Sequence, residues 1–199
     1  MLLDVDESQL VLLDYQQRLL PAIHDGPGVL ARAVQLARAA RLLGVACWAV
    51  EQNPAKLGPT DPALAALVPK PLGKMAFSAA DLLVQRLRPA TRPSAGNARS
   101  LPKHLRKPEA EPEAPATIIL AGCEAHVCLL QTALELLDDE FDVCVVTDAC
   151  GSRSERDRDA AFDRLAGAGC ELVTTEMVLF EWLRTAEHPA FREIHALIK

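Results

Sequence analysis

Apolar segments of strand length recur along the chain, separated by longer segments with helical periodicity. The clearest of them cover residues 9–14, 45–50, 116–122, 141–148 and 170–175. Each is almost continuously apolar, which is typical of strands buried on both faces. Strands that alternate with helices predict a mostly parallel sheet with helices on each side. We therefore expect an α/β protein with three layers, α/β/α, around a Rossmann-like parallel sheet.

The segment between the first two of these strands, residues 29–44, carries a helix signal. It ends on Gly44, and glycine commonly terminates helices because it adopts the left-handed conformation easily. The helical period predicts one apolar stripe, formed by Leu30, Val34, Ala37 and Leu42.

Three further helices are expected at residues 79–88, 126–139 and 154–169. In the last of these, Ser154 and Asp157 stand at the N-cap and N3 positions. Two short helices are expected to end the chain. The helix at 126–139 is apolar around much of its circumference, as expected for a helix that packs beside a sheet.

Residues 89–115 interrupt the alternation. They contain six of the 14 prolines and show no hydrophobic period, so we expect a surface excursion that is partly disordered or packed on a neighbouring subunit. The chain of 199 residues is long enough for one well-buried domain and short for two. We predict a single domain over residues 1–199, with the Pro- and charge-rich excursion at about 89–115.

Charge and composition exclude some function classes. The net charge of −6 argues against nucleic-acid binding, because phosphate contacts need a surplus of Lys and Arg. The N-terminus has acidic residues and no basic segment before an apolar run, and no apolar stretch approaches membrane-spanning length. We therefore expect a cytoplasmic protein with no nucleic-acid or membrane partner.

The six cysteines allow several interpretations. The stretch "LAGCEAHVCLL" holds two of them, which could be core residues, metal ligands, half of a disulfide, or a nucleophile. Disulfides are rare in reducing compartments. A zinc site usually needs CxxC pairs or Cys/His clusters, and the chain has neither spacing, so we expect no metal.

Two polar residues follow apolar strands directly. Asp14 ends the segment 9–14, and Cys128 follows the segment 116–122 after a short turn. In open α/β sheets, sites form outside the carboxyl ends of the strands, at the point where the strand order reverses. A cysteine near a helix N-terminus is expected to have a lowered pKa because of the helix dipole. A capping role for Asp14 and a core role for Cys128 remain the alternatives.

The chain also resembles the isochorismatase-like cysteine hydrolase superfamily, and most closely its metal-free branch. The matching stretches run in the family's order: "LLDYQQRLLPAI" (12–23), "EQNPAKLGPTDPAL" (51–64), "KMAFSA" (74–79), "GCEAHVCLLQTALELL" (122–137), "VTDACGSRSERDR" (146–158) and "VTTEMVLFEWL" (173–183). The resemblance implies a sheet of about six strands in the order 3-2-1-4-5-6.

The resemblance also implies a catalytic triad. Asp14 would be the general base, Lys74 its cationic partner and Cys128 the nucleophile. The family's cis peptide bond maps to Cys123–Glu124, and the backbone N–H groups of Glu124 and Cys128 would form the oxyanion hole. Position near these motifs makes Gln16, Gln52 and Phe77 possible pocket-lining residues.

Departures from the family pattern refine the expected activity. No histidine occurs between residues 25 and 103, where the nicotinamidases carry metal ligands, so we expect no metal and no other cofactor. Cys128 itself favours acyl substrates over the vinyl ether of isochorismatases, which lack this cysteine. Ala125 stands where relatives often have threonine.

The resulting expectation is a homo-oligomeric hydrolase of a small amide-like or other acyl molecule, acting on C–N bonds through a thioester. Two alternatives remain. The chain could be a weak or inactive member that binds a ligand or partner, or it could hydrolyse a vinyl ether.

Overall fold

The computed structural model describes residues 2–88 and 117–199. These residues contain a six-stranded sheet in the order β3-β2-β1-β4-β5-β6, in which all neighbouring strands are parallel. The strands are β1 (Ser8–Leu13), β2 (Ala46–Gln52), β3 (Leu72–Lys74), β4 (Thr117–Gly122), β5 (Asp142–Val146) and β6 (Glu171–Val173). The predicted fold class and strand order are confirmed. The predicted excursion at 89–115 lies outside the described residues. The extent of the single domain, residues 1–199, stays a prediction.

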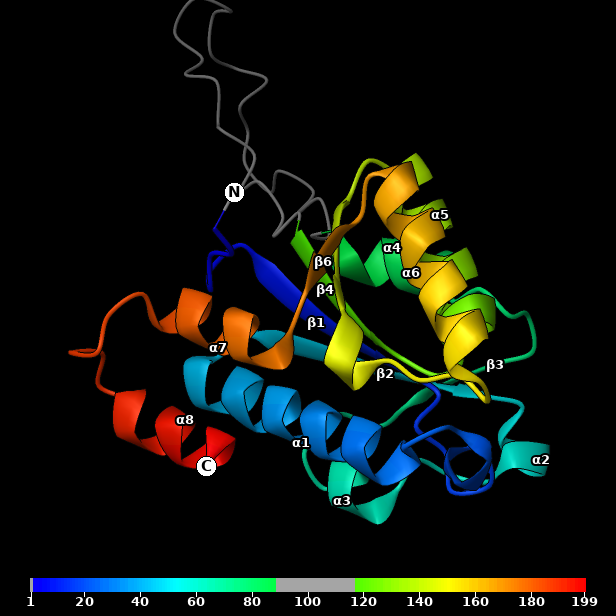
Figure 1. Ribbon diagram of the computed structural model, residues 1–199, viewed down its shortest axis with the longest axis horizontal. Coiled ribbons are helices and arrows are strands. Elements are labelled where there is room, and N and C mark those ends of the chain that lie inside the picture. The colour runs from blue at the N-terminus through cyan, green and yellow to red at the C-terminus, as the bar shows by residue number, and fades with distance from the viewer. Residues whose placement is uncertain (1, 89–116) are drawn as a thin grey trace, which may run out of the picture.

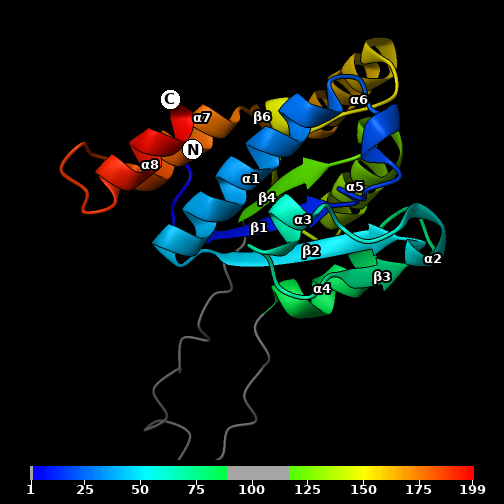
Figure 2. The same ribbon diagram turned by 90° about the horizontal axis from the view of Figure 1, so that it is seen from below.

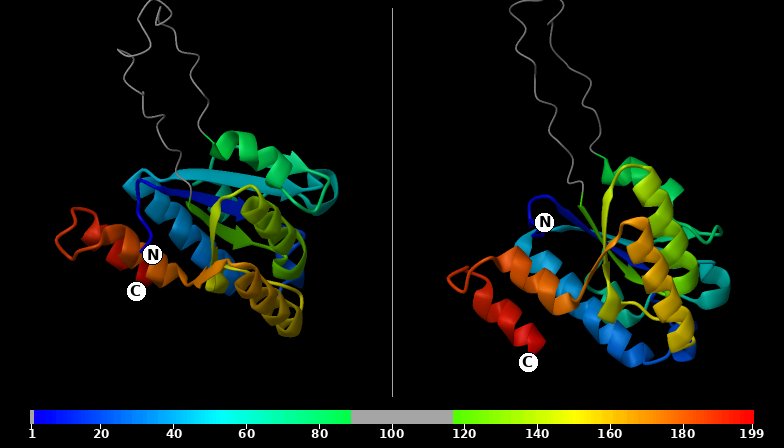
Figure 3. Two further views of the ribbon diagram at one scale, coloured as in Figure 1. Left: turned by 90° about the horizontal axis from the view of Figure 1, so that it is seen from above. Right: turned by 45° about the horizontal axis from the view of Figure 1, so that its top comes forward.

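Helices cover both faces of the sheet (Figures 1 and 3). One face carries α4 (Ala80–Leu87), α5 (Leu130–Asp138) and α6 (Glu155–Ala168). Helix α5 contacts both α4 and α6. The other face carries α1 (Gly26–Leu43), which contacts α3 (Pro62–Ala65), α7 (Thr175–Leu183) and α8 (Phe191–Ile198). Figure 2 shows α1 and α4 on opposite sides of the strands. The short helix α2 (Pro54–Leu57) follows β2.

The central strands are buried as their composition predicts. All six residues of β1 are buried, and β4 is buried from Ile118 to Gly122. The two strands approach each other closely where both end: a Cβ placed on Gly122 would lie 2.5 Å from the carbonyl oxygen of Leu13. Only glycine fits at that point. The carboxyl ends of β1 and β4 are thus held side by side.

Helix ends follow the sequence signals. Helix α1 ends at Gly44, whose φ of 77° is left-handed, and α6 begins after Ser154, whose side chain accepts a hydrogen bond from the N–H of Asp157. The predicted stripe on α1 is wrong at Leu42, which is 43% exposed. Five positions separate Leu42 from the buried Ala37, and at about 100° per residue this rotates Leu42 away from the sheet.

Strand β3 was not located from the sequence, because three residues are too short to show a period. Its pairing with β2 places Lys74 opposite Gln52. None of the helices in the described segments has the length and apolar character needed to cross a membrane.

Candidate active site

The strand order reverses between β1 and β4, so the carboxyl ends of these two strands flank the position where α/β proteins form their sites. Asp14 is the first residue after β1 and has a left-handed φ of 59°, an uncommon conformation for a residue other than glycine. Its N–H donates to the carbonyl of Val50, which extends the pairing with β2 by one residue. The Asp14 carboxylate is completely buried.

Lys74 supplies the opposite charge. It is the last residue of β3, and its side chain passes along the edge of the sheet toward Asp14. Lys74 Nζ lies 2.9 Å from Asp14 Oδ2, and the two side chains are only 2% and 0% exposed. Because water is excluded, the attraction between these charges is much stronger than in a surface ion pair.

Cys128 lies in the turn after β4. Residues Ala125–Leu129 form one π-helical turn that leads into α5, and Cys128 is 6% exposed. The charges of Asp14 and Lys74 both act on its thiol, so the three groups form one cluster. The structure thus brings together three side chains that are far apart in the sequence, and the carboxylate can accept the proton of the thiol.

Burial controls the basicity of Asp14. Removal from water disfavours the charged carboxylate and raises the pKa of Asp14, and this exceeds the opposing effect of the Lys74 charge. A carboxylate with a raised pKa is a stronger base than an exposed aspartate.

The expected lowering of the Cys128 pKa is wrong. Burial is the largest cause and the charge of Asp14 the next, and together they raise the pKa of Cys128 to about 12 despite the opposing effect of Lys74. The thiol also lies four residues after the cap residue Glu124, beyond the first N–H groups of the turn. The resting group is a thiol that needs a base to lose its proton.

Gln16 and Gln52, predicted as possible pocket-lining residues, direct their side chains into the structure. Gln16 Nε2 donates to the carbonyls of Gln52 and Gly58, and its Oε1 accepts from the Gln52 N–H. Gln52 Oε1 accepts from Lys74 Nζ at 2.6 Å. The ring of Phe77 is 55% exposed, while its carbonyl oxygen lies 2.8 Å from Lys74 Nζ. Gln52 and Phe77 thus contact Lys74 directly, whereas Gln16 contacts Gln52, and the role of the three residues in binding a ligand stays a prediction.

The turn before Cys128 has the predicted backbone geometry. The Cys123–Glu124 peptide bond is cis, as expected. The N–H of Ala125 donates to the carbonyl of Gly151, and the Glu124 carboxylate pairs with Arg153 at 2.7 Å. The loop after β5 therefore fixes the turn in place. The oxyanion hole formed by the backbone N–H groups of Glu124 and Cys128 stays a prediction.

Thr132 was not identified from the sequence. This fully buried hydroxyl donates to the carbonyl of Cys128 at 2.7 Å and accepts from the N–H of Ala79 at 3.0 Å. It thereby joins the turn of Cys128 to the segment that follows Lys74. The available signal was a hydroxyl one helical turn after a cysteine in an otherwise apolar helix.

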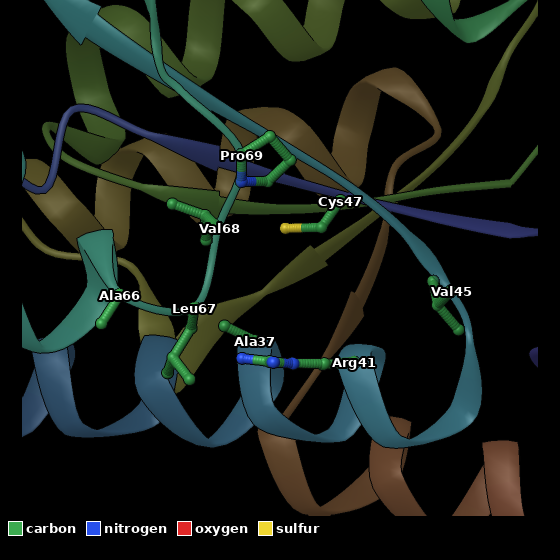
Figure 4. Close-up of a pocket in the computed structure, with 8 residues that line it drawn as sticks. All are labelled: Ala37, Arg41, Val45, Cys47, Ala66, Leu67, Val68 and Pro69. Atoms are coloured by element: carbon green, nitrogen blue, oxygen red, sulfur yellow. The ribbon is translucent and has the colours of Figure 1, made fainter.

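A separate hollow of about 400 Å³ lies near the opposite ends of the strands (Figure 4). Cys47, the second residue of β2, borders it beside Arg41 of α1. None of the predicted site residues borders this hollow. Residues 2–88 and 117–199 contain no group of three or more His, Cys, Asp or Glu side chains arranged to hold a metal ion.

Comparisons with known proteins extend over nearly the whole chain. Residues 8–177 match the family model described as isochorismatase domain. The chain is 35% identical over 194 residues to isochorismatase domain-containing protein 2A of Mus musculus, covering 98% of this chain and 84% of the mouse protein.

Solved structures agree with this match. The structure of MAR1 ribonuclease from Caenorhabditis elegans superposes with a TM-score of 0.81 at 30% identity, over 98% of this chain and 91% of that one. The YcaC gene product of Escherichia coli, described as an octameric hydrolase of unknown specificity, has a TM-score of 0.74 at 23% identity, over 98% of this chain and 94% of that one. The second likeness shows the fold alone.

Proposed function

This chain belongs to the isochorismatase family, and on that premise we propose that it hydrolyses a small amide or other acyl compound through Cys128. The family supports a hydrolase. The observation that carries the finer proposal is the buried Asp14–Lys74 ion pair at the reversal of strand order, whose two charges both act on the thiol of Cys128.

The first half of the proposed reaction is acylation. As the sulfur of Cys128 forms a bond to the substrate carbonyl carbon, its proton passes to Asp14 and the carbonyl oxygen becomes an oxyanion. The oxyanion then reforms the carbonyl, the C–N bond breaks, and Asp14 returns the proton to the leaving amine. The products are a free amine and a thioester on Cys128.

The second half releases the acid. Water attacks the thioester, Asp14 takes a proton from that water, and the sulfur leaves and regains a proton as the thiol. Lys74 lowers the pKa of Cys128 and so favours the negative charge that develops on sulfur. Because the resting thiol has a pKa of about 12, proton transfer to Asp14 must accompany attack on the carbonyl.

Selective alkylation tests the nucleophile without a known substrate. We expect iodoacetamide to modify Cys128 before the other five thiols, as measured by mass spectrometry of peptides at short reaction times. Cys47 is a matched control, because burial raises its pKa to about 12 as well, yet it is more exposed than Cys128. If accessibility alone decides, Cys47 reacts first, and the proposed nucleophile is then wrong.

The general base is tested by Asp14→Asn, which keeps the shape of the side chain and removes its basicity. We expect hydrolysis to fall by about 10³-fold, within the range typical of a lost general base. Release of acid from a panel of small amides and esters measures this, with Cys128→Ala as the inactive control and Cys47→Ala as the active one. Hydrolysis that persists in Cys128→Ala would instead favour the vinyl-ether reaction.

The relative from Caenorhabditis elegans makes RNA the second substrate to test. We favour a small molecule because Asp14, Lys74 and Cys128 are each at most 6% exposed, and because the net charge of −6 repels a polyanion. RNA cleavage that disappears in Asp14→Asn would replace the acyl proposal. Absence of turnover on both substrate classes, together with unselective alkylation, would favour the ligand-binding alternative.

Self-association and location in the cytoplasm stay predictions. The relative from Escherichia coli is described as octameric, which makes a homo-oligomer of this chain a reasonable proposal. Light scattering coupled to size-exclusion chromatography tests it by mass, since one chain weighs 21.5 kDa. A single species of that mass would contradict the proposal.

A further inference from the structure

The ammonium group of Lys74 is surrounded by oxygen acceptors. Its Nζ lies 2.9 Å from Asp14 Oδ2, 2.6 Å from Gln52 Oε1, 2.8 Å from the carbonyl oxygen of Phe77 and 3.3 Å from that of Ala76. An ammonium has three N–H donors, so these four oxygen atoms compete for three protons, while its charge also acts on the thiol of Cys128. The direction of each N–H bond therefore depends on which acceptors are held rigidly.

Gln52 is the most rigidly held of the side-chain acceptors. Its Nε2 donates to the carbonyl of Met75 at 2.9 Å, which fixes Oε1 as the atom that faces Lys74. Its backbone N–H and carbonyl are both bonded by the amide of Gln16, which is itself fully buried. A flip of the Gln52 amide would point N–H groups at a cation and at no acceptor, so the observed orientation is the stable one.

We propose that Gln52 is a positioning residue that holds the ammonium of Lys74 between Asp14 and Cys128, an inference that rests on the function proposed above. Loss of the Gln52 oxygen removes the shortest contact of Nζ. The ammonium then reorients toward the carbonyls of Ala76 and Phe77, which lie on its own loop. Less of its charge reaches the sulfur, and the thiol becomes harder to ionise.

The test is the rate at which iodoacetamide alkylates Cys128 at a fixed, mildly alkaline pH, relative to the rate for Cys47 in the same sample. Gln52→Met keeps the length of the side chain and removes the acceptor. We expect the ratio of the Cys128 rate to the Cys47 rate to fall about tenfold, as for the loss of one hydrogen bond to a charged group. A residue with only a structural role would lower the melting temperature and leave this ratio unchanged.

Gln9→Met is the matched control. Gln9 is buried and, like Gln52, it is bonded through both ends of its amide, to the carbonyl of Leu87 and to the indole N–H of Trp48, but it lies near the start of β1. We expect this variant to lose stability while keeping the wild-type ratio of the two alkylation rates.

Gln52→Glu is the second variant for testing the role of Gln52 if Gln52→Met does not fold. The new carboxylate would compete with Asp14 for the ammonium, and it would add a negative charge near sulfur, so the ratio of the Cys128 rate to the Cys47 rate should also fall. A wild-type ratio in either folded variant would overturn the inference. Failure of the proposed function gives a different result, because wild-type Cys128 would then not react ahead of Cys47.

Discussion

Strand β1 has a buried polar side chain near each end, Gln9 at its start and Asp14 just after its last residue. The amide of Gln9 donates to the carbonyl of Leu87 at 2.7 Å and accepts from Trp48 Nε1 at 3.0 Å. A neutral group bonded in this way costs little to bury. Asp14 is fully buried and has an ammonium as its partner, although burying two charges costs several kcal/mol for each ion.

The difference between these two ends indicates their roles. Neutral groups in place of both charges would fill the same space at lower cost, so stability alone does not explain an ion pair there. The strand end with the costly charges also has the thiol, a cis peptide bond and a left-handed aspartate. Two partners of Gln9, the carbonyl of Leu87 and the indole N–H of Trp48, are neutral groups, which is the arrangement expected where the task is to hold strands and helices together.

The largest expected effect on stability comes from Lys74→Met. It leaves the carboxylate of Asp14 buried without a cation, and we expect the free energy of unfolding in urea to fall by about 4 kcal/mol. The double variant Asp14→Asn/Lys74→Met should regain most of this loss, because no buried charge remains. A loss no greater than that of Gln9→Met would show that the ends of β1 do not differ in the proposed way.

Gln9→Met should have a smaller effect. It leaves the carbonyl of Leu87 and the indole N–H of Trp48 unpaired, and we expect a loss of about 2 kcal/mol in the same unfolding experiment. Hydrolytic activity measured well below the melting temperature should stay within about twofold of wild type, since Gln9 lies about 16 Å from Asp14 at the usual rise per residue of a strand. A large loss of activity in the folded variant would contradict the structural role of Gln9.

The smallest effect is on the pH dependence of stability. Burial raises the pKa of Asp14 in the folded protein above its ordinary value of 3.8, so the folded state retains a proton that the unfolded chain releases. The contribution of Asp14 is therefore most favourable below pH 3.8 and declines as the pH rises through the folded-state pKa.

Urea unfolding of wild type and Asp14→Asn across the acid range measures this dependence. The wild type should lose stability relative to Asp14→Asn by about 1.4 kcal/mol for each pH unit that separates the folded and unfolded pKa values. The corresponding difference between wild type and Gln9→Met should be constant with pH. An opposite slope would mean that Lys74 outweighs burial at Asp14.

The sequence predicted the elements with strong local signals. The continuous apolar runs located β1, β2, β4, β5 and β6, and Ser154 and Gly44 marked helix ends because capping depends on immediate neighbours. The short strand β3 was not located from the sequence, since its position depends on pairing with β2. Leu42 was misplaced because an apolar residue is also common on exposed helix faces.

The candidate site was predicted in part. The motifs named Asp14, Lys74 and Cys128, and the structure brings their side chains into contact. The acidity of Cys128 was predicted in the wrong direction, because the sequence suggested a helix dipole and could not give the burial or the distance to Asp14. The hydrogen bonds of Gln52 to Lys74 and of Thr132 to Cys128 were not predicted either. The first joins two strands that meet only in the folded sheet, and the second depends on the exact geometry of one helical turn.

The order of apolar and polar residues by itself determined that this chain forms strands alternating with helices, because period and capping are local properties. The tertiary structure decided which polar side chains lose water and which partners they meet. Ionisation depends on burial and on charges within a few ångströms. These quantities exist only once β1, β3 and the turn after β4 converge, so the chemical character of Asp14 and Cys128 was fixed by folding.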